Sequence, residues 1–198
     1  MILQVKKFSE KLLLPLGKKL KKIPANYFTL FGLFSAVVVF LGFLFHSLLI
    51  VMIFLFITEF FDQLDGVVAR LQGPTQLGAF YDSTLDRIGD VFIFVGVIYS
   101  GYTTLEIGLI VLIGAFLTSY TRAKIEALGI NNLYGIGLIE RTDRVPILFL
   151  GALFQIWFPT AIWWTMIILA VGTNLTTIQR IIFAFRKFST ERQTQETS

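Results

Sequence analysis

The chain has 198 residues, of which 55% are hydrophobic and 15% are charged, with a net charge of +4. A soluble domain carries about 25% charged residues and could not bury so many apolar side chains, so the composition excludes an ordinary soluble protein and indicates one membrane domain. There is no cysteine and only one histidine, His46, which excludes disulfides, thiolate nucleophiles and Cys/His zinc sites. A bound metal would need oxygen ligands, which favour Mg²⁺ or Mn²⁺.

The two ends of the chain are too polar to span a membrane. Residues 1–22 interleave lysines with leucines, a pattern that predicts a juxtamembrane amphipathic helix lying on anionic lipid. A solvated basic tail is the alternative for this segment. A signal peptide is not expected, because the charged region is too long and a full-length span follows it. Residues 187–198 predict a short disordered C-terminal tail.

Between these ends, residues 23–186 predict an all-α integral membrane domain. The predicted spans are 27–46, 48–71, 77–100, 104–127, 144–158 and 160–186.

Six spans put both termini on one side of the membrane. All 17 Lys and Arg residues then fall on or near that side. The positive-inside rule therefore predicts cytoplasmic termini for a multi-pass protein of the cell membrane. The basic balance is thus explained by topology, and we expect no nucleic-acid partner.

Four aspartates lie where the second and third predicted spans approach the cytoplasm. Asp62 and Asp65 are three residues apart, and Asp82 and Asp86 are four apart, so each pair lies on one helix face. The turn signal Gly73-Pro74 folds the two spans antiparallel, which lets the pairs converge. Clustered carboxylates in a membrane indicate function and need cations to stay ionised. They fit a divalent-metal site that binds a pyrophosphate, or the ion pathway of a transporter.

The spacing of this segment resembles the motif D-x-x-D-G-x-x-A-R…G-x-x-x-D-x-x-x-D of the CDP-alcohol phosphotransferase family. All eight fixed positions agree, although the seven residues between Arg70 and Gly78 are one fewer than the family spacing. The segment from Asn26 to Gly32 resembles the family's P-N-x-L-T segment, with Ala25 in place of the proline. The eight matching residues are Asp62, Asp65, Gly66, Ala69, Arg70, Gly78, Asp82 and Asp86.

The resemblance implies a reaction and a role for each aspartate. Asp62, Asp65, Asp82 and Asp86 would hold Mg²⁺ or Mn²⁺, with two ions expected, and Asp86 would also be the general base. The base deprotonates an acceptor hydroxyl, which attacks the phosphorus next to the lipid and releases CMP. Such enzymes are usually homodimers. The residues expected to contact the CDP-lipid are Asn26, Thr29, Asp62, Asp65, Gly66, Ala69, Arg70, Thr75 and Gly78.

A second set of cations suggests the acceptor. The segments holding Arg122, Lys124, Arg141, Arg144 and Arg180 resemble those of phosphatidylinositol-phosphate and archaetidylinositol-phosphate synthases, where they accompany a basic pocket for inositol phosphate. Arginines match phosphate oxygens bidentately, so a phosphorylated polyol acceptor is expected. Glycerol 3-phosphate is the alternative acceptor, and the positive-inside rule alone would also account for these cations. The donor is CDP-diacylglycerol or CDP-archaeol.

Overall fold

The computed structural model describes residues 2–130, 133 and 135–196. In these residues the secondary structure is helical, with seven α-helices. Contacts within the chain divide it into two compact units, Met1–Ser100 and Gly101–Ser198.

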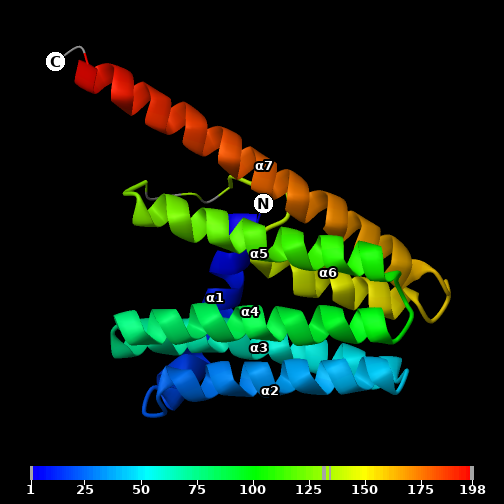
Figure 1. Ribbon diagram of the computed structural model, residues 1–198. Coiled ribbons are helices and arrows are strands. Elements are labelled where there is room, and N and C mark those ends of the chain that lie inside the picture. Colours follow the sequence, from blue (N-terminus) through cyan, green and yellow to red (C-terminus); the bar gives the residue numbers. More distant parts are fainter. Residues whose placement is uncertain (1, 131–132, 134, 197–198) are drawn as a thin grey trace. The chain divides into compact units, whose positions relative to one another are not determined.

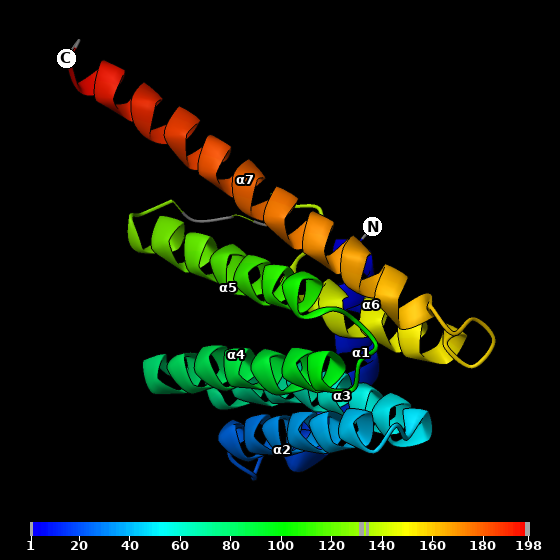
Figure 2. The same cartoon turned by 45° about the vertical axis from the view of Figure 1, so that its right-hand side comes forward.

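The first unit has four helices. The last three lie side by side and alternate in direction, while the first runs across them (Figure 1 and Figure 2). Gly73 lies between the third and fourth helices with φ of 93°, a left-handed value that glycine adopts without strain. The tight connection predicted at Gly73-Pro74 is therefore present. The four helices are α1 (Ile2–Leu20), α2 (Ala25–Leu44), α3 (Leu48–Gln72) and α4 (Gln76–Tyr99).

The core of the first unit joins α1 and α2 to one side of α3. Phe28 of α2 packs with Leu64 and Val68 of α3, and apolar residues of α1 cover this cluster. Gly17 brings α1 close to α3, because a Cβ at this position would lie 2.7 Å from Cγ1 of Val67. The segment predicted as an amphipathic helix is thus helical and packed on α3, while its place at a lipid surface stays a prediction.

The second unit consists of α5 (Leu105–Ala127), α6 (Arg141–Phe154) and α7 (Ala161–Glu196). Small residues bring these helices together: a Cβ at Gly114 would overlap Thr173, and one at Gly151 would overlap Thr165. Helix α7 continues to Glu196. The prediction of a disordered tail from residue 187 is therefore wrong through residue 196, because helical propensity carries the last apolar span onward without a break.

Three helices are long and apolar enough to cross a membrane, as judged over the described part of the chain: Ala25–Leu44, Leu105–Ala127 and Ala161–Ser189. Large apolar side chains along them, such as Phe34, Ile113 and Trp164, are exposed, as expected for surfaces that face lipid. Helix α6 begins at Arg141, earlier than the predicted span 144–158, and has 14 residues, about 21 Å of helix. A hydrocarbon core is about 30 Å thick, so the count of six spans stays a prediction.

Candidate active site

Three of the four predicted metal ligands come together in the first unit. Asp62 lies in the second half of α3, and Asp82 and Asp86 lie in the first half of α4. Because α3 and α4 are antiparallel and joined by a short turn, these stretches face each other. Each of the three aspartates offers a carboxylate oxygen, and all three oxygens lie within 4.8 Å of one another. The side chains are partly buried, which keeps them open to a ligand.

Asp65 is placed differently from the other three. Its position one turn after Asp62 is rotated by about 60° around the helix axis, and its side chain is buried, with 4% exposed. Among the described residues the close group of oxygens consists of Asp62, Asp82 and Asp86. The role of Asp65 as a fourth ligand stays a prediction.

The three carboxylates fit a divalent cation. Neighbouring oxygens bound to one octahedral Mg²⁺ lie about 3.0 Å apart, since each bond is about 2.1 Å long. The oxygens of Asp62, Asp82 and Asp86, all within 4.8 Å of one another, would need to close by at most about 1.8 Å. An all-oxygen donor set is also what hard cations such as Mg²⁺ and Mn²⁺ prefer.

Several residues that were predicted to contact the nucleotide also lie close together. The hydroxyl of Thr75 accepts a hydrogen bond from the backbone N–H of Gly78 at 3.0 Å and so caps α4. A Cβ added to Gly78 would lie 3.7 Å from Oδ1 of Asn26, which brings the start of α2 to this cap. Thr29 lies one turn further along α2, where its buried hydroxyl donates to the carbonyl of Ala25 at 3.5 Å.

The small residues of the motif leave space beside Arg70. A Cβ on Gly66 would lie 3.4 Å from Nη1 of Arg70, so the guanidinium group folds back along α3 over Gly66. Ala69 precedes Arg70 and is partly buried. A cation above a glycine gives a phosphate both charge and room to approach the helix.

Gln72 is a residue that the sequence analysis missed. Its side-chain N–H₂ donates to the carbonyls of Lys21 at 2.8 Å and Ile23 at 2.6 Å. Its side-chain oxygen accepts from the backbone N–H of Ala25 at 3.2 Å. The last residue of α3 therefore ties down the α1–α2 connection, next to Asn26. Its place just after the motif was the only signal in the sequence.

The predicted acceptor residues belong to the second unit and differ in exposure. Lys124 is exposed on α5, and Arg122 pairs with Glu126 one turn away at 2.9 Å. Arg141 is partly buried at the first position of α6. These three cations lie at or near the surface of their unit.

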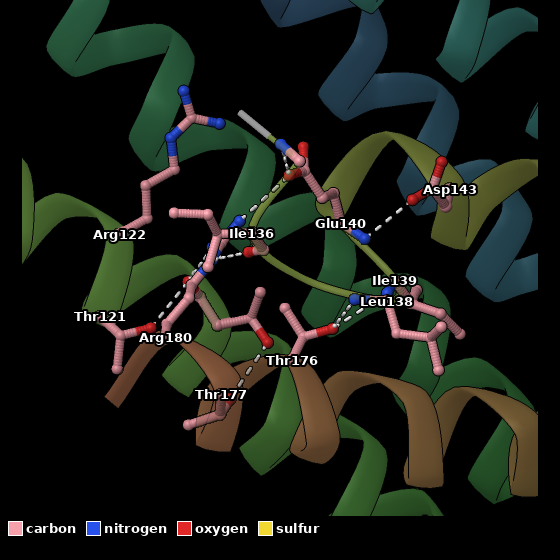
Figure 3. Close-up of polar contacts among 12 residues, drawn as sticks. Thr121, Arg122, Ile136, Leu138, Ile139, Glu140, Asp143, Thr176, Thr177 and Arg180 are labelled. Atoms are coloured by element: carbon pink, nitrogen blue, oxygen red, sulfur yellow. Dashed lines mark hydrogen bonds and ion pairs between the residues drawn. The ribbon is translucent and has the colours of Figure 1, made fainter. Parts of the chain in front are cut away.

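Arg144 and Arg180 are instead buried, with 0% and 2% of their surface exposed. Nη2 of Arg144 donates to the carbonyl of Ala115 at 3.1 Å. Arg180 donates through Nε to the carbonyl of Ile136 at 2.9 Å and through Nη1 to that of Thr118 at 2.6 Å. Figure 3 shows Arg180 reaching from α7 toward the loop that holds Ile136. These arginines thus hold backbone carbonyls of the fold, which the charge pattern alone did not predict.

Comparison with known proteins identifies the family. A family model described as CDP-alcohol phosphatidyltransferase matches residues 22–132, which contain both the Asn26 segment and the aspartate motif. The chain belongs to the CDP-alcohol phosphatidyltransferase family. It is accordingly an enzyme of this class and a multi-pass membrane protein.

Relatives within the CDP-alcohol phosphatidyltransferase family are similar over most of the chain. The archaetidylinositol phosphate synthase of Methanothermobacter thermautotrophicus is 38% identical over 170 residues, covering 83% of this chain and 85% of the relative. The crystal structure of Mycobacterium tuberculosis phosphatidylinositol phosphate synthase with CDP-DAG bound is 28% identical, with a TM-score of 0.77 over 88% of this chain and 94% of that one. The same enzyme with manganese and citrate is 28% identical, with a TM-score of 0.68 over 87% of this chain and 88% of that one.

Proposed function

We propose that this enzyme transfers a lipid-phosphate group from a CDP-lipid to myo-inositol phosphate and releases CMP. The observation that carries the proposal is the group formed by Asp62, Asp82 and Asp86, with oxygens within 4.8 Å of one another on the family motif. The acceptor is supported by the names of the relatives, which are synthases of inositol-phosphate lipids.

The reaction is a displacement at the phosphorus next to the lipid. Asp86 takes the proton from an acceptor hydroxyl, whose oxygen forms the new bond to that phosphorus. The bond between this phosphorus and the oxygen of the CMP phosphate breaks, and CMP leaves with the electron pair. Asp86 then carries the proton, which it releases to water before the next turnover.

A divalent cation, Mg²⁺ or Mn²⁺, fits the carboxylate group, and we propose two ions held by Asp62, Asp65, Asp82 and Asp86. When bound, these ions would neutralise the pyrophosphate and the charge on the leaving CMP. The manganese in the relative from Mycobacterium tuberculosis supports the choice of a divalent cation.

The CDP moiety would lie along the start of α4 and the end of α3. Gly66 and Ala69 let it approach the helix, and Arg70 pairs with a phosphate. Asn26 and Thr75, which meet beside Gly78, offer polar atoms to the nucleotide. Thr29 and Gly78 complete the proposed contacts.

The acceptor phosphate would be held by the cations of the second unit. Arg141 is the best suited, because the N–H groups at the start of α6 add positive potential beside its charge. Arg122 and Lys124 supply further charge from α5. Arg144 and Arg180 are included in this proposal, although backbone carbonyls already engage part of each guanidinium group.

We further propose six spans in the cell membrane, with both termini and the active site on the cytoplasmic side, and a homodimer. The one-sided placement of Lys and Arg supports the orientation, and the family resemblance supports the dimer. These features would let soluble acceptors reach the aspartates from the cytoplasm.

The test is an acceptor panel on the purified full-length chain. CMP release is measured with CDP-diacylglycerol and with CDP-archaeol, each with myo-inositol phosphate, glycerol 3-phosphate or inositol, with Mg²⁺ or Mn²⁺. Myo-inositol phosphate should give the highest kcat/KM. Preference for glycerol 3-phosphate would show that this compound, and not myo-inositol phosphate, is the acceptor. Cation flux into liposomes with no CMP release under any condition would refute the enzyme proposal.

A further inference from the structure

The loop before α6 is held on α7 by one hydroxyl group. Oγ1 of Thr176 accepts hydrogen bonds from the backbone N–H groups of Leu138 and Ile139, each at 2.9 Å. It also donates to the carbonyl of Gly172 one turn earlier in α7, at 2.8 Å. Figure 3 shows both amides of the loop pointing at this oxygen. Thr176 has 0% of its surface exposed, so water cannot replace these bonds.

The loop also fits α7 closely in shape. Gly137 has φ of 148°, and a Cβ there would overlap Cγ2 of Thr176. A Cβ on Gly172 would overlap Ile139 from the other side. The loop can therefore pack against α7 in one position, and the hydroxyl of Thr176 fixes which loop residues lie there.

The packing of this loop on α7 sets the position of the first turn of α6. Glu140 ends the loop and is the N-cap of α6, and its backbone N–H donates to the carboxylate of Asp143 at 2.8 Å. Its side chain pairs with Nη2 of Arg180 at 3.4 Å. Arg141 follows directly, so its guanidinium group starts from a backbone that Thr176 holds.

We propose that Thr176 is a positioning residue for binding of the acceptor phosphate, acting through the loop that it holds and through Arg141. This inference rests on the proposed function, in which Arg141 binds that phosphate. Thr176 is fully buried and does not touch the acceptor itself. Its hydroxyl orders the backbone from which Arg141 reaches the anion.

The hydroxyl can be separated from the packing of Thr176. Valine has nearly the same shape as threonine and would fill the same space against Gly137, but it cannot accept from Leu138 and Ile139. Serine keeps the hydroxyl and loses only a methyl group. A buried N–H without a partner raises the free energy of the packed state. The loop of a Thr176→Val variant should therefore detach from α7 more often.

The experiment compares Thr176→Val and Thr176→Ser in the purified full-length enzyme. Thr176→Val should raise the KM for myo-inositol phosphate about tenfold, as expected for the loss of buried hydrogen bonds, with the KM for CDP-lipid changed less than about twofold. Thr176→Ser should restore most of the acceptor KM. Thr165→Val is the matched control, since Thr165 lies near the other end of α7 and donates to Ala161; it should leave the acceptor KM unchanged.

Hydrogen exchange supplies a readout that is independent of activity. The amides of Leu138 and Ile139 should exchange faster in Thr176→Val than in Thr176→Ser. If Thr176→Val does not fold, Thr176→Cys carries the same test, because a thiol is a weak acceptor. Faster exchange with an unchanged acceptor KM, or an equal rise of both KM values, would overturn the proposal. Wild-type enzyme that uses only glycerol 3-phosphate would refute the proposed acceptor, and the KM for glycerol 3-phosphate would then decide the role of Thr176.

Discussion

The side-chain oxygen of Gln72 accepts a hydrogen bond from the backbone N–H of Ala25 at 3.2 Å. Ala25 is the first residue of α2, and the N-cap residue before it, Pro24, makes no side-chain cap hydrogen bond. Gln72 of α3 therefore supplies the acceptor that the start of α2 lacks. Asn26 comes next, so this bond sets where a proposed nucleotide contact lies.

Replacing Gln72 should weaken binding of the donor. Gln72→Ala removes a cap worth about 1 kcal/mol, and we expect the KM for CDP-lipid to rise about fivefold while the KM for the acceptor stays the same. Steady-state CMP release with each substrate varied measures this. Gln179→Ala, at an exposed position on α7, is the control.

A double-mutant cycle tests whether Gln72 acts through Asn26. If it does, Gln72→Ala should add little to the effect of Asn26→Ala. Additive effects would contradict a shared role.

Gly66→Ala should damage donor binding without damaging the fold. The added Cβ would lie 3.4 Å from Nη1 of Arg70, an ordinary contact, and alanine favours helix over glycine by about 1 kcal/mol. We therefore expect an unfolding temperature at or above that of the wild type, with a KM for CDP-lipid raised about tenfold or more. Gly89→Ala is the matched control, because its added Cβ would also make an ordinary contact, 3.5 Å from the Cβ of Ala36. Equal donor KM values in the two variants would refute the role of Gly66.

Asp86→Asn should abolish most turnover. An amide cannot take the proton of the acceptor hydroxyl, and loss of a general base costs about 10²- to 10⁴-fold in rate. Single-turnover CMP release with saturating Mn²⁺ measures the chemical step, and Mn²⁺ titration by electron spin resonance measures metal affinity in the same samples. Glu106→Gln, at an exposed position on α5, also replaces a carboxylate by an amide and should leave turnover and metal affinity unchanged. Full turnover by Asp86→Asn would refute the mechanism.

Arg141→Ala should affect the acceptor and spare the donor. A hydrogen bond to a charged group contributes about 1.5–3 kcal/mol, so the KM for myo-inositol phosphate should rise at least about tenfold. Isothermal titration with the acceptor gives the same comparison as a dissociation constant. Arg186→Ala, at an exposed position on α7, controls for the loss of one cation. A donor KM that rises as much as the acceptor KM would argue against an acceptor site at Arg141.

Asp143 should make stability depend on pH. Burial raises the pKa of its carboxyl group above the ordinary value, against the opposing hydrogen bond from the Glu140 backbone. The folded state therefore binds the proton more tightly than the unfolded state. The contribution of Asp143 to stability falls as pH rises from about 3.9 through the raised pKa, and stays lower above it.

Asp143→Asn removes this dependence, because an amide oxygen can still accept from Glu140. The variant should gain in unfolding temperature relative to the wild type as pH rises from 3.5 to 7, approximately across the window set by the raised pKa. Thermal unfolding in detergent across this range measures the difference in unfolding temperature between the variant and the wild type. A difference that moves against the variant with rising pH would contradict a raised pKa for Asp143.

Much of the aspartate site could be predicted from the sequence. Helical spacing puts Asp82 and Asp86 on one face whatever the helix packs against, and Gly73-Pro74 determines that α4 returns along α3. These two local facts bring the aspartate pairs toward each other, while the close group of Asp62, Asp82 and Asp86 also depends on the packing of α3 and α4 against α2. Asp65 could not be assigned in this way, since its burial depends on which side of α3 the core covers.

The roles of single polar groups between distant segments could not be predicted. Gln72 bonds to residues 47 to 51 positions away, and Thr176 to residues 37 and 38 positions away. Nothing near Thr176 in the sequence marks it, and Gln72 is marked only by its place just after the aspartate motif. Arg144 and Arg180 looked like ligands for an anion, yet their partners include carbonyls of α5 and the loop.

By itself the sequence determined that this is an all-helical membrane protein, and it determined the order of its helices and the spacing of its aspartates. These features depend on composition and on helical periodicity, which act over a few residues. The tertiary structure decided which carboxylates offer oxygens together and which hydroxyl and amide hold the loops beside the predicted sites. Those choices depend on how helices far apart in the chain pack, because a buried polar group takes whichever partner the packing brings to it.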